Sequence, residues 1–472
     1  MLFRSGASAV QELGFVFAAI VEYANRLIEK GLPVEKVFKN IRVTFGISSS
    51  YFMEIAKLRA SKLLWNTIVK TYGLNTEEHK LYIHARTSKY NQTKYDPYVN
   101  MLRTTTQAFS AVLGGIDSLH TNAFDEEFNT PDEFGRRIAR NTQIILKEES
   151  NLVKLIDPAG GSYYVEKLTD EVASLSWALL QEVEKQGGMV NAIKNEFVQN
   201  EIKKVSDLRI SDLVKRKSVL VGTNMYANVK ENLPEKRIFD KAAFIKKRAE
   251  FLQKYRVSGN NEKHAAIIEK LGKLSDSSSE EFFETGIAAY VEGATLGEVA
   301  NSLHSGYEES CSVTPLKIYR LAEKFEELRD TAEEFKKKHG YTLKIFLATM
   351  GPVKQHKGRA DFSRGFFEVA GFDVIYPNAL SSTAEAIAAY EKSGANVVVI
   401  CSTDDTYPDI VPAFMQELKL KEKTGLVVLA GYPKEQVEAY KEAGVSEFIY
   451  LGCDAYTLLK RVQAKSIELS VN

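Results

Sequence analysis

Between residues 341 and 472, short apolar runs alternate with amphipathic segments, and this alternation constrains the fold more than any other feature of the chain. Strands are predicted at Leu343–Thr349, Asp373–Tyr376, Asn396–Cys401, Gly425–Ala430 and Glu447–Leu451, and helices at Ala360–Ala370, Ser382–Ser393, Ile410–Leu418, Lys434–Ala443 and Ala455–Lys465. Strands that are each followed by a helix favour a doubly wound parallel sheet of flavodoxin-like order. Ligands of such sheets bind beyond the carboxyl ends of the strands, here Met350–Gly358, Ser402–Thr406 and Gly431–Pro433.

Residues 1–225 contain a second series of strands and helices. A first helix is predicted over Ser8–Lys30, ending at Gly31-Leu-Pro33. Strands are predicted at Arg42–Gly46, Leu81–Arg86, Ser118–Thr121 and Val153–Ile156, and helices around Tyr51–Tyr72, Tyr98–Leu113, Thr130–Glu149 and Val165–Gln186. Repeated βα units predict a parallel sheet or a barrel. Residues 226–340 are polar and rich in Lys and Glu, which predicts a helical connecting segment.

The charge balance excludes several classes of partner. Lys and Arg together number 62, as do Asp and Glu, so no net charge attracts nucleic acid or an anionic membrane. No apolar run reaches the length of a membrane span. Three cysteines, Cys311, Cys401 and Cys453, lack the spacing of zinc ligands and indicate a reducing compartment. We expect a cytoplasmic protein with no metal site.

Several stretches carry a family resemblance and follow one another in the family's order. They are Gly6–Leu13, Tyr51–Ala60 with Trp65, Asp96–Thr104, Ser118–Glu126, Arg137–Gln143, Ile156–Pro158 and Glu182–Met189. Together they resemble methylmalonyl-CoA mutases. The resemblance implies a TIM (β/α)8 barrel that binds coenzyme A substrates, a helical linker, and a C-terminal cobalamin-binding domain. Here it implies the C-terminal half of a barrel in 1–225, the linker in 226–340 and the cobalamin-type domain, with a degenerate motif, in 341–472.

The family catalyses an isomerisation. Its catalytic members interconvert methylmalonyl-CoA and succinyl-CoA through a radical that adenosylcobalamin supplies when its Co–C bond breaks. In heterodimeric members one subunit catalyses, and a related smaller subunit has lost the site. The present chain therefore has to be compared with both kinds of subunit.

The cobalamin motif of the family is degenerate here. Base-off binders carry Asp-x-His-x-x-Gly, in which the His binds cobalt and the Asp fixes its tautomer. Counting back from Gly358, Val353 holds the Asp position and Gln355 the His position, and neither side chain can take these roles. Shifting the alignment by one residue would place His356 at the His position. Lys354 would then stand at the Asp position and Arg359 at the Gly position, so the rest of the motif would be lost. We expect His356 to be a surface histidine on a loop instead.

Two later cobalamin markers and one barrel marker are also replaced. Cys401-Ser-Thr403 stands where the family has a Ser-x-Leu loop around the benzimidazole tail, and Gly431-Tyr432 where it has Gly-Gly. The ring of Tyr432 would fill space that the family keeps open. In the barrel, catalytic members carry Thr-Ser-Gly-Trp where the corrin approaches, whereas this chain has Thr87-Ser-Lys-Tyr90. Lys89 would place a long cation in that contact.

Other candidate residues carry weaker predictions. The family's Arg-x-Ser, used on the coenzyme A tail, aligns with Asn40-Ile-Arg42, and a two-residue slip would restore Arg42. The family's active-site His falls near Met1 and is absent. His120 lies at a strand end, and we expect a satisfied structural histidine. Asp157–Gly161 is expected to be a tight turn and not a phosphate cradle, and Asp404-Asp405 a solvated loop.

Only about four predicted strands precede residue 200, too few to close an eight-stranded barrel, so we expect roughly the first half of the barrel to be missing. Three explanations of the missing half are open: a truncated gene model, a separately encoded half, or completion by a partner. We favour the first. The leading hypothesis is the non-catalytic small subunit of a heterodimeric mutase, which stabilises the catalytic large subunit. Adenosylcobalamin then belongs to the complex, no cofactor binds this chain, and the coenzyme A thioester is bound through the partner. The alternatives are a competent mutase that uses His356 and a non-enzymatic binding or assembly module.

Overall fold

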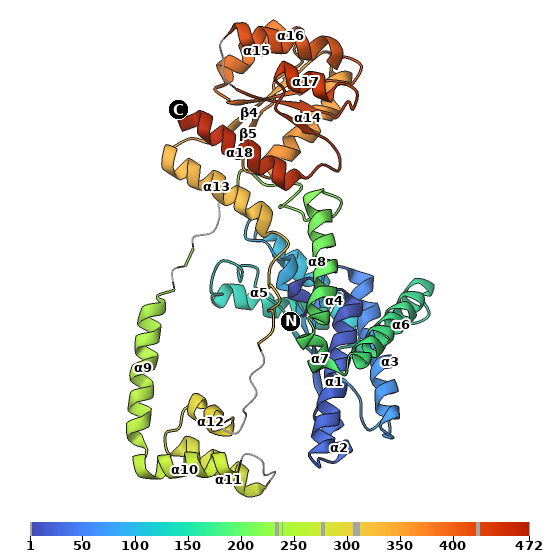
Figure 1. Ribbon diagram of the computed structural model, residues 1–472, viewed down its shortest axis with the longest axis vertical. Helices are drawn as coiled ribbons and strands as arrows, with labels where there is room; N and C mark the ends of the chain where they lie inside the picture. Colours follow the sequence, from blue (N-terminus) through green and yellow to red (C-terminus); the bar gives the residue numbers. More distant parts are fainter. Residues whose placement is uncertain are drawn as a thin grey trace. The chain divides into compact units, whose positions relative to one another are not determined.

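The computed structural model describes residues 2–231, 236–237, 239–274, 279–304, 312–421 and 425–471. The chain forms two compact units, one from residues 1–235 with 314–472 and one from residues 236–313. The larger unit contains two separate parallel sheets, one from each end of the sequence (Figure 1). The mixed α/β class with parallel sheets, predicted from the sequence, is therefore confirmed.

The N-terminal sheet has three parallel strands in the order β1-β2-β3, namely Arg42–Ile47, Tyr82–Thr87 and Ser118–His120. The predicted strand at Val153–Ile156 is wrong. Asn151 has left-handed backbone angles (φ 53°), which a strand cannot continue, and Leu152–Lys154 form a 3-10 turn. The apolar residues that mimic a strand in the sequence stay at the surface, and Ile156 is 99% exposed.

Helices cover one face of this sheet. The helices of the N-terminal region are α1 (Ala9–Glu29), α2 (Val34–Asn40), α3 (Tyr51–Thr71), α4 (Val99–Leu113), α5 (Glu133–Ile144), α6 (Tyr163–Lys185), α7 (Met189–Lys194) and α8 (Phe197–Val214). Because strand residues alternate between faces, Val43, Phe45 and Ile47 of β1 join the helical core, whereas Arg42 and Thr44 are exposed on the other face. His84 and Arg86 of β2 also project from that second face.

The C-terminal sheet has five parallel strands in the order β5-β4-β6-β7-β8. They are β4 (Lys344–Thr349), β5 (Asp373–Ile375), β6 (Val397–Cys401), β7 (Leu426–Ala430) and β8 (Glu447–Ile449). All five predicted strands are confirmed. Their near-continuous apolar sequences fit strands that are buried on both faces.

Helices pack on both faces of the C-terminal sheet (Figure 1). One core joins Ile345 and Leu347 of β4 to α13 (Glu323–His339), α14 (Val353–Glu368) and α18 (Ala455–Val471). The other joins Phe346 and Ala348 to α15 (Thr383–Ser393), α16 (Tyr407–Leu420) and α17 (Val437–Ala443). Helix α14 begins seven residues before its predicted start, because Pro352 occupies the N-cap position and the polar residues after it are competent helix formers.

The smaller unit is helical, as its Lys- and Glu-rich sequence predicts. It contains α9 (Lys241–Ser258), α10 (Asn261–Lys273), α11 (Glu280–Val291) and α12 (Leu296–Leu303). A small core of Leu271, Ala289, Ala294 and Val299 holds α10, α11 and α12 together. Across the part of the chain that the structure describes, no helix combines the length and apolarity that a membrane span needs.

Candidate functional site

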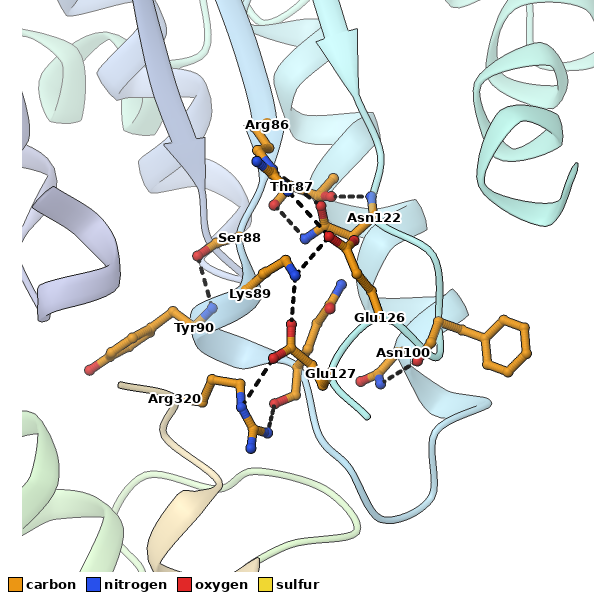
Figure 2. A network of polar contacts seen from close by, with 12 residues as sticks. Arg86, Thr87, Ser88, Lys89, Tyr90, Asn100, Asn122, Glu126, Glu127 and Arg320 are labelled. Atoms are coloured by element: carbon orange, nitrogen blue, oxygen red, sulfur yellow. Dashed lines mark hydrogen bonds and ion pairs between the residues drawn. The ribbon is translucent and has the colours of Figure 1, made fainter. Parts of the chain in front are cut away.

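A cluster of polar side chains lies at the carboxyl ends of β2 and β3 (Figure 2). Thr87, the last residue of β2, is held by Asn122, whose backbone N–H donates to Thr87 Oγ1 and whose side-chain amide donates to the Thr87 carbonyl, both at 2.9 Å. Ser88 Oγ accepts the N–H of Tyr90 and starts a short 3-10 helix. These bonds fix the point from which Lys89 leaves the strand.

Lys89 is fully engaged in ion pairs. Its Nζ lies 2.7 Å from Glu126 Oε1 and 3.6 Å from Glu127 Oε1 (Figure 2). Arg86, on the strand below, reaches the same Glu126 oxygen at 3.3 Å. The cation that the sequence predicts in this place is present, and two carboxylates of the same chain neutralise it.

The network continues onto the segment that leads into α13. Arg320 Nε lies 3.2 Å from Glu127 Oε2, and its Nη2 lies 2.6 Å from Glu326 Oε2. Arg320 also donates to the carbonyl of Gln92 at 3.2 Å. The side chains of Glu127 and Glu326 are only 8% and 6% exposed. Glu127 and Arg320, nearly two hundred positions apart, are therefore joined by charge across the carboxyl end of the sheet.

Burial governs the protonation of this cluster. Burial raises the pKa of the Glu127 carboxyl, and Lys89 and Arg320 act in the opposite direction. Three cations, Arg86, Lys89 and Arg320, face the carboxylates of Glu126, Glu127 and Glu326, and Arg320 also lies 3.9 Å from Glu323. Each cation is therefore neutralised within the protein, as in a cluster that stabilises packing.

Histidines line the uncovered face of the sheet beneath this cluster. His84 Nδ1 lies 2.8 Å from Ser118 Oγ on the neighbouring strand. His120 is exposed, and the part of the chain that the structure describes provides its ring with no hydrogen-bonding partner, so the prediction of a satisfied histidine is wrong. Partial burial lowers the pKa of His120, and Arg86 lowers it further. His120 and Glu126 also line a cavity of about 930 Å³ beside β3.

The predicted cobalamin loop of the C-terminal sheet is largely helical. Val353 is exposed at the start of α14, and the side chain of Gln355 turns back over Gly351. His356 is 3% exposed, and its Nδ1 lies 2.9 Å from the Gly351 carbonyl. The expectation of a surface histidine on a loop is therefore wrong, because the early start of α14 turns this ring inward. Gly358 is an exposed helical residue with open space where a Cβ would point.

The next two predicted positions follow β6 and have partners within the protein. Cys401 is buried, with Sγ 3.6 Å from Ser363 Oγ, and burial raises the pKa of its thiol to about 12. Thr403 Oγ1 lies 3.4 Å from Thr406 Oγ1 in the loop that enters α16. Asp404 and Asp405 in this loop are both exposed, as the sequence predicts.

Side chains from three elements close the space around Gly431, which follows β7. Arg359 Nη2 lies 3.0 and 3.1 Å from the two carboxylate oxygens of Asp404. A Cβ at Gly431, whose φ is 153°, would lie 3.0 Å from Arg359, 3.1 Å from Asp404 and 3.2 Å from Tyr407. Tyr432 turns outward, and its ring centroid lies 4.6 Å from that of Tyr450.

We expect Tyr407→Phe to lower the free energy of unfolding by about 1–3 kcal/mol. The Tyr407 hydroxyl donates to the Ala430 carbonyl at 2.6 Å and accepts the Ser402 N–H at 3.1 Å, and the variant leaves both groups buried and unpaired. Urea unfolding followed by circular dichroism measures the change. The matched control is Tyr341→Phe, which loses one bond to the Ser470 carbonyl at an exposed position. An equal loss of stability in the two variants would contradict the inference that the Tyr407 hydroxyl holds the ends of β6 and β7 together.

The remaining predicted positions lie away from both clusters. The turn at 157–161 is confirmed as a turn, because the amides of Gly160 and Gly161 already donate to Asp157 O and Glu166 Oε1. Arg42 is at the amino end of β1, opposite the polar cluster, and donates to the Lys39 carbonyl at 2.7 Å. The position aligned with the family's active-site histidine, residue 1, lies outside the described residues. Among the residues that are described, no group of His, Cys, Asp or Glu could hold a metal ion.

Comparison with known proteins decides the family. A family model described as methylmalonyl-CoA mutase matches residues 1–309, which is more than half of the chain. The chain belongs to the methylmalonyl-CoA mutase family. The methylmalonyl-CoA mutase small subunit of Porphyromonas gingivalis is 30% identical over 465 residues, which are 98% of this chain and 64% of that protein. The large subunit of the same organism is 31% identical over 452 residues, and the Escherichia coli mutase is 31% identical over 458 residues.

This mutase chain spans less than two thirds of the length of these relatives, since the large subunit and the Escherichia coli protein are covered to 63% and 64%. Its identity to the small subunit (30%) and to the large subunit (31%) is nearly equal. Overall identity therefore leaves the type of subunit open, and the type has to be argued from individual residues.

The sequence of the mutase chain identifies Lys89 but not its partners. Glu126 is part of a family motif, whereas Glu127 and Arg320 lie outside every motif. The sequence signal for the two carboxylates is that Glu126 and Glu127 are adjacent and follow shortly after a predicted strand. Arg320 gives no signal in the sequence, because a contact over nearly two hundred residues depends on the tertiary fold.

Proposed function

We propose that this chain is the non-catalytic small subunit of a heterodimeric methylmalonyl-CoA mutase, with the role of stabilising and positioning the catalytic large subunit. The complex interconverts methylmalonyl-CoA and succinyl-CoA, and the large subunit binds adenosylcobalamin and the coenzyme A thioester. The N-terminal region (1–225) is part of a (β/α)8 barrel, 226–340 is the linker, and 341–472 is a flavodoxin-like domain of the cobalamin-binding type. The strand order β5-β4-β6-β7-β8 supports the last assignment, because it corresponds to the flavodoxin-like order 2-1-3-4-5.

The observation that carries the proposal is the ion-pair cluster of Lys89, Glu126, Glu127 and Arg320. Catalytic members of the family have a glycine at the position of Lys89, which allows the corrin to approach the strand end closely. Here a long side chain fills that position, and its charge is already neutralised. Binding a flat macrocycle against this surface would require several partly buried ion pairs to be broken.

The C-terminal sheet supports the same proposal, because its residues do not fit a base-off cobalamin. Val353 and Gln355 cannot act as the Asp and His of the motif, and His356 is directed into the protein and held by a backbone carbonyl. The place of the cofactor tail, between the ends of β6 and β7, is closed by Arg359, Asp404 and Tyr407 around Gly431. We therefore derive no step of the reaction through a cofactor on this chain.

The expected result of an adenosylcobalamin titration is no base-off change in the absorption spectrum of the cofactor. The full chain and its His356→Ala variant should behave alike, because the ring of His356 packs in the protein and donates one hydrogen bond to the Gly351 carbonyl. A base-off spectrum that is lost in His356→Ala would overturn the proposal in favour of a competent mutase. Circular dichroism of the variant establishes that it is folded.

Co-expression tests the role in assembly. The chain is produced with the Porphyromonas gingivalis mutase large subunit, and the amount and thermal stability of soluble large subunit are measured with and without it. We expect the large subunit to gain stability and the complex to sediment as a heteromer. Absence of binding to the large subunit, together with capture of an unrelated protein, would favour a non-enzymatic binding module.

A further inference from the structure

The smaller unit is an insertion, and both of its connections meet the larger unit at one loop. The larger unit contains residues 1–235 and 314–472, so the chain leaves it and later returns to it. The first connection, residues 218–231, and the second connection, residues 314–322, both form hydrogen bonds with residues 90–96, which follow β2. We call residues 90–96 the β2 loop. A displacement of either connection therefore acts on the same loop.

The first connection ends in a largely buried anchor. One carboxylate oxygen of Glu231 accepts the backbone N–H of Asp96 at 2.6 Å, and the other lies 3.0 Å from Nη2 of Arg329 on α13. The guanidinium of Arg329 also lies 4.2 Å from the centre of the Tyr95 ring. The side chains of Glu231 and Arg329 are only 9% and 5% exposed, so solvent screens their ion pair little. One carboxylate therefore holds the carboxyl-terminal end of the β2 loop.

The second connection holds the opposite end of the β2 loop. The N–H of Leu321 donates to the Tyr90 carbonyl at 2.9 Å. The hydroxyl of Tyr319 lies 3.2 Å from the hydroxyl of Tyr90, and the two buried rings meet edge to face with centroids 5.4 Å apart. Tyr90 directly follows Lys89 in the sequence. The two connections therefore fix the β2 loop at its two ends.

The backbone of the β2 loop is strained at Asp96. Its φ is 49°, in the left-handed region, which an aspartate adopts more readily than most residues but still at a cost in free energy. Gly222 of the first connection packs closely on this residue, since a Cβ at Gly222 would lie 3.3 Å from the Asp96 Cβ. Such conformations persist where the surroundings impose them, and they are frequent in switch regions. Release of the loop would let Asp96 relax, which gives the loop a physical reason to adopt a second arrangement.

The β2 loop is also continuous with the ion-pair cluster (Figure 2). Lys89 precedes the loop and lies 3.6 Å from Glu127 Oε1, whereas Arg320, within the second connection, lies 3.2 Å from Glu127 Oε2. Relaxation of the loop would therefore move two cations that neutralise one buried carboxylate. The state of the two connections and the state of the cluster are linked through shared residues.

We propose that the β2 loop is a conformational switch that the two connections of the smaller unit hold closed together. Release of either connection lets the loop relax, and this loosens the other connection and the Lys89 cluster. The smaller unit is then a regulatory insertion, whose folded state determines how firmly the carboxyl end of the N-terminal sheet is held. Because neither cobalamin nor the large subunit takes part, this inference can fail while the proposed function stands, and the reverse.

Hydrogen–deuterium exchange of the full chain, resolved to single amides, tests the coupling in both directions. Tyr319→Phe removes the hydroxyl contact at one end of the β2 loop, and we expect the N–H of Asp96 at the other end to exchange about threefold faster. Glu231→Ala removes the anchor of the first connection and should accelerate exchange of the Leu321 N–H at least about tenfold. Coupling between two sites is reciprocal, so both effects are required.

Two matched variants control for local damage. Tyr341→Phe removes an exposed tyrosine hydroxyl, and Glu327→Ala removes an exposed ion pair of α13, so both should leave exchange of the two connections unchanged. In Glu231→Ala, the amides of α13 should also exchange as slowly as in the unmodified chain. Acceleration that stays at each variant's own contacts, or that extends equally over α13, would overturn the proposal.

A change inside the smaller unit tests its regulatory part. Leu271 is 1% exposed in the core that joins α10, α11 and α12, so Leu271→Asp should unfold this unit. Both connections then border an unfolded chain that no longer helps to order them, and exchange over the β2 loop should rise about threefold. Val291→Asp introduces the same charge at an exposed position of α11 and should leave the loop unchanged. Unaltered exchange of the loop in Leu271→Asp would overturn the regulatory role.

Discussion

Lys57→Met is expected to lower the free energy of unfolding of the N-terminal region by about 3–5 kcal/mol. Lys57 is 0% exposed and lies between two buried carboxylates, with Nζ 2.7 Å from Glu12 Oε2 and 2.6 Å from Glu54 Oε2. It also donates to the Gly46 carbonyl at 2.6 Å. The variant leaves two carboxylates in the core without their only shared cation, and an uncompensated buried charge is among the costliest defects in a protein.

Urea unfolding followed by tryptophan fluorescence measures this loss, because Trp65 and Trp177, the two tryptophans of the chain, both belong to the core around Lys57. The triple variant Lys57→Met, Glu12→Gln, Glu54→Gln should recover most of the stability, since it removes the charges together. Lys167→Met is the control, at an exposed ion pair, with an expected change below about 0.5 kcal/mol. A similar loss in the single and triple variants would show that packing, and not charge, is responsible.

Lys57 also has a predictable pH dependence. Burial alone would lower its pKa, but Glu12 and Glu54 outweigh burial and hold the pKa above its ordinary value. A raised pKa on a cation stabilises the fold below the unfolded pKa, and the contribution is lost as pH rises through the folded pKa. The contribution from the raised pKa of Lys57 is therefore fully present at neutral pH and is lost in strong alkali.

The sequence predicts the strands of the C-terminal sheet because each is an apolar run bounded by turn residues and followed by a helical pattern. The same rule fails at Val153–Ile156, where the left-handed backbone of Asn151 turns the chain into the 3-10 turn Leu152–Lys154 and the run forms no strand pairing. Strand identity there depends on a partner that local sequence does not specify. Spacing predicts secondary structure well only where the tertiary surroundings agree with it.

In the ion-pair cluster around Lys89 and in the side chains around Gly431, some features can likewise be read from the sequence and others cannot. Replacement of motif residues is visible in the sequence, so Lys89, Val353 and Gln355 are identified without a structure. What replaces the lost contacts is visible only in the fold, because Arg320 and Arg359 reach carboxylates that are remote in the sequence. The motif alone predicts that His356 lies on a loop, whereas helix α14 has already begun at that position.

Arg320→Met is expected to destabilise the larger unit by an amount near the lower end of the range of about 3–5 kcal/mol seen when one partner of a buried pair is removed. Its guanidinium is the cation that Glu127 and Glu326 share, at 3.2 and 2.6 Å. Without it, the cation that remains within ion-pair distance of Glu127 among the described residues is Lys89, at 3.6 Å. The segment that leads into α13 should loosen, and exchange of the Leu321 N–H, which donates to the Tyr90 carbonyl, should accelerate.

The pH dependence of this variant separates a charge effect from a packing effect. The pKa of Glu127 is raised by burial already, and loss of Arg320 removes one of the cations that lower it. A carboxyl with a raised folded pKa destabilises the protein while ionised, and the penalty is relieved as pH falls through that pKa. The difference between Arg320→Met and the unmodified chain should therefore shrink as the pH is lowered from neutrality through the raised pKa of the Glu127 carboxyl.

A matched surface arginine provides the control. Arg461 also makes a two-point contact with one carboxylate, to Glu447 at 2.6 and 2.9 Å, but its side chain is 56% exposed. Arg461→Met should cost no more than about 1 kcal/mol because solvent screens the pair. If Arg320→Met behaved like Arg461→Met, the cluster at the end of β2 would be a loose surface network that a cofactor could displace. That result would remove the main support for a non-catalytic subunit, because the proposal requires the cluster to be a fixed part of the fold.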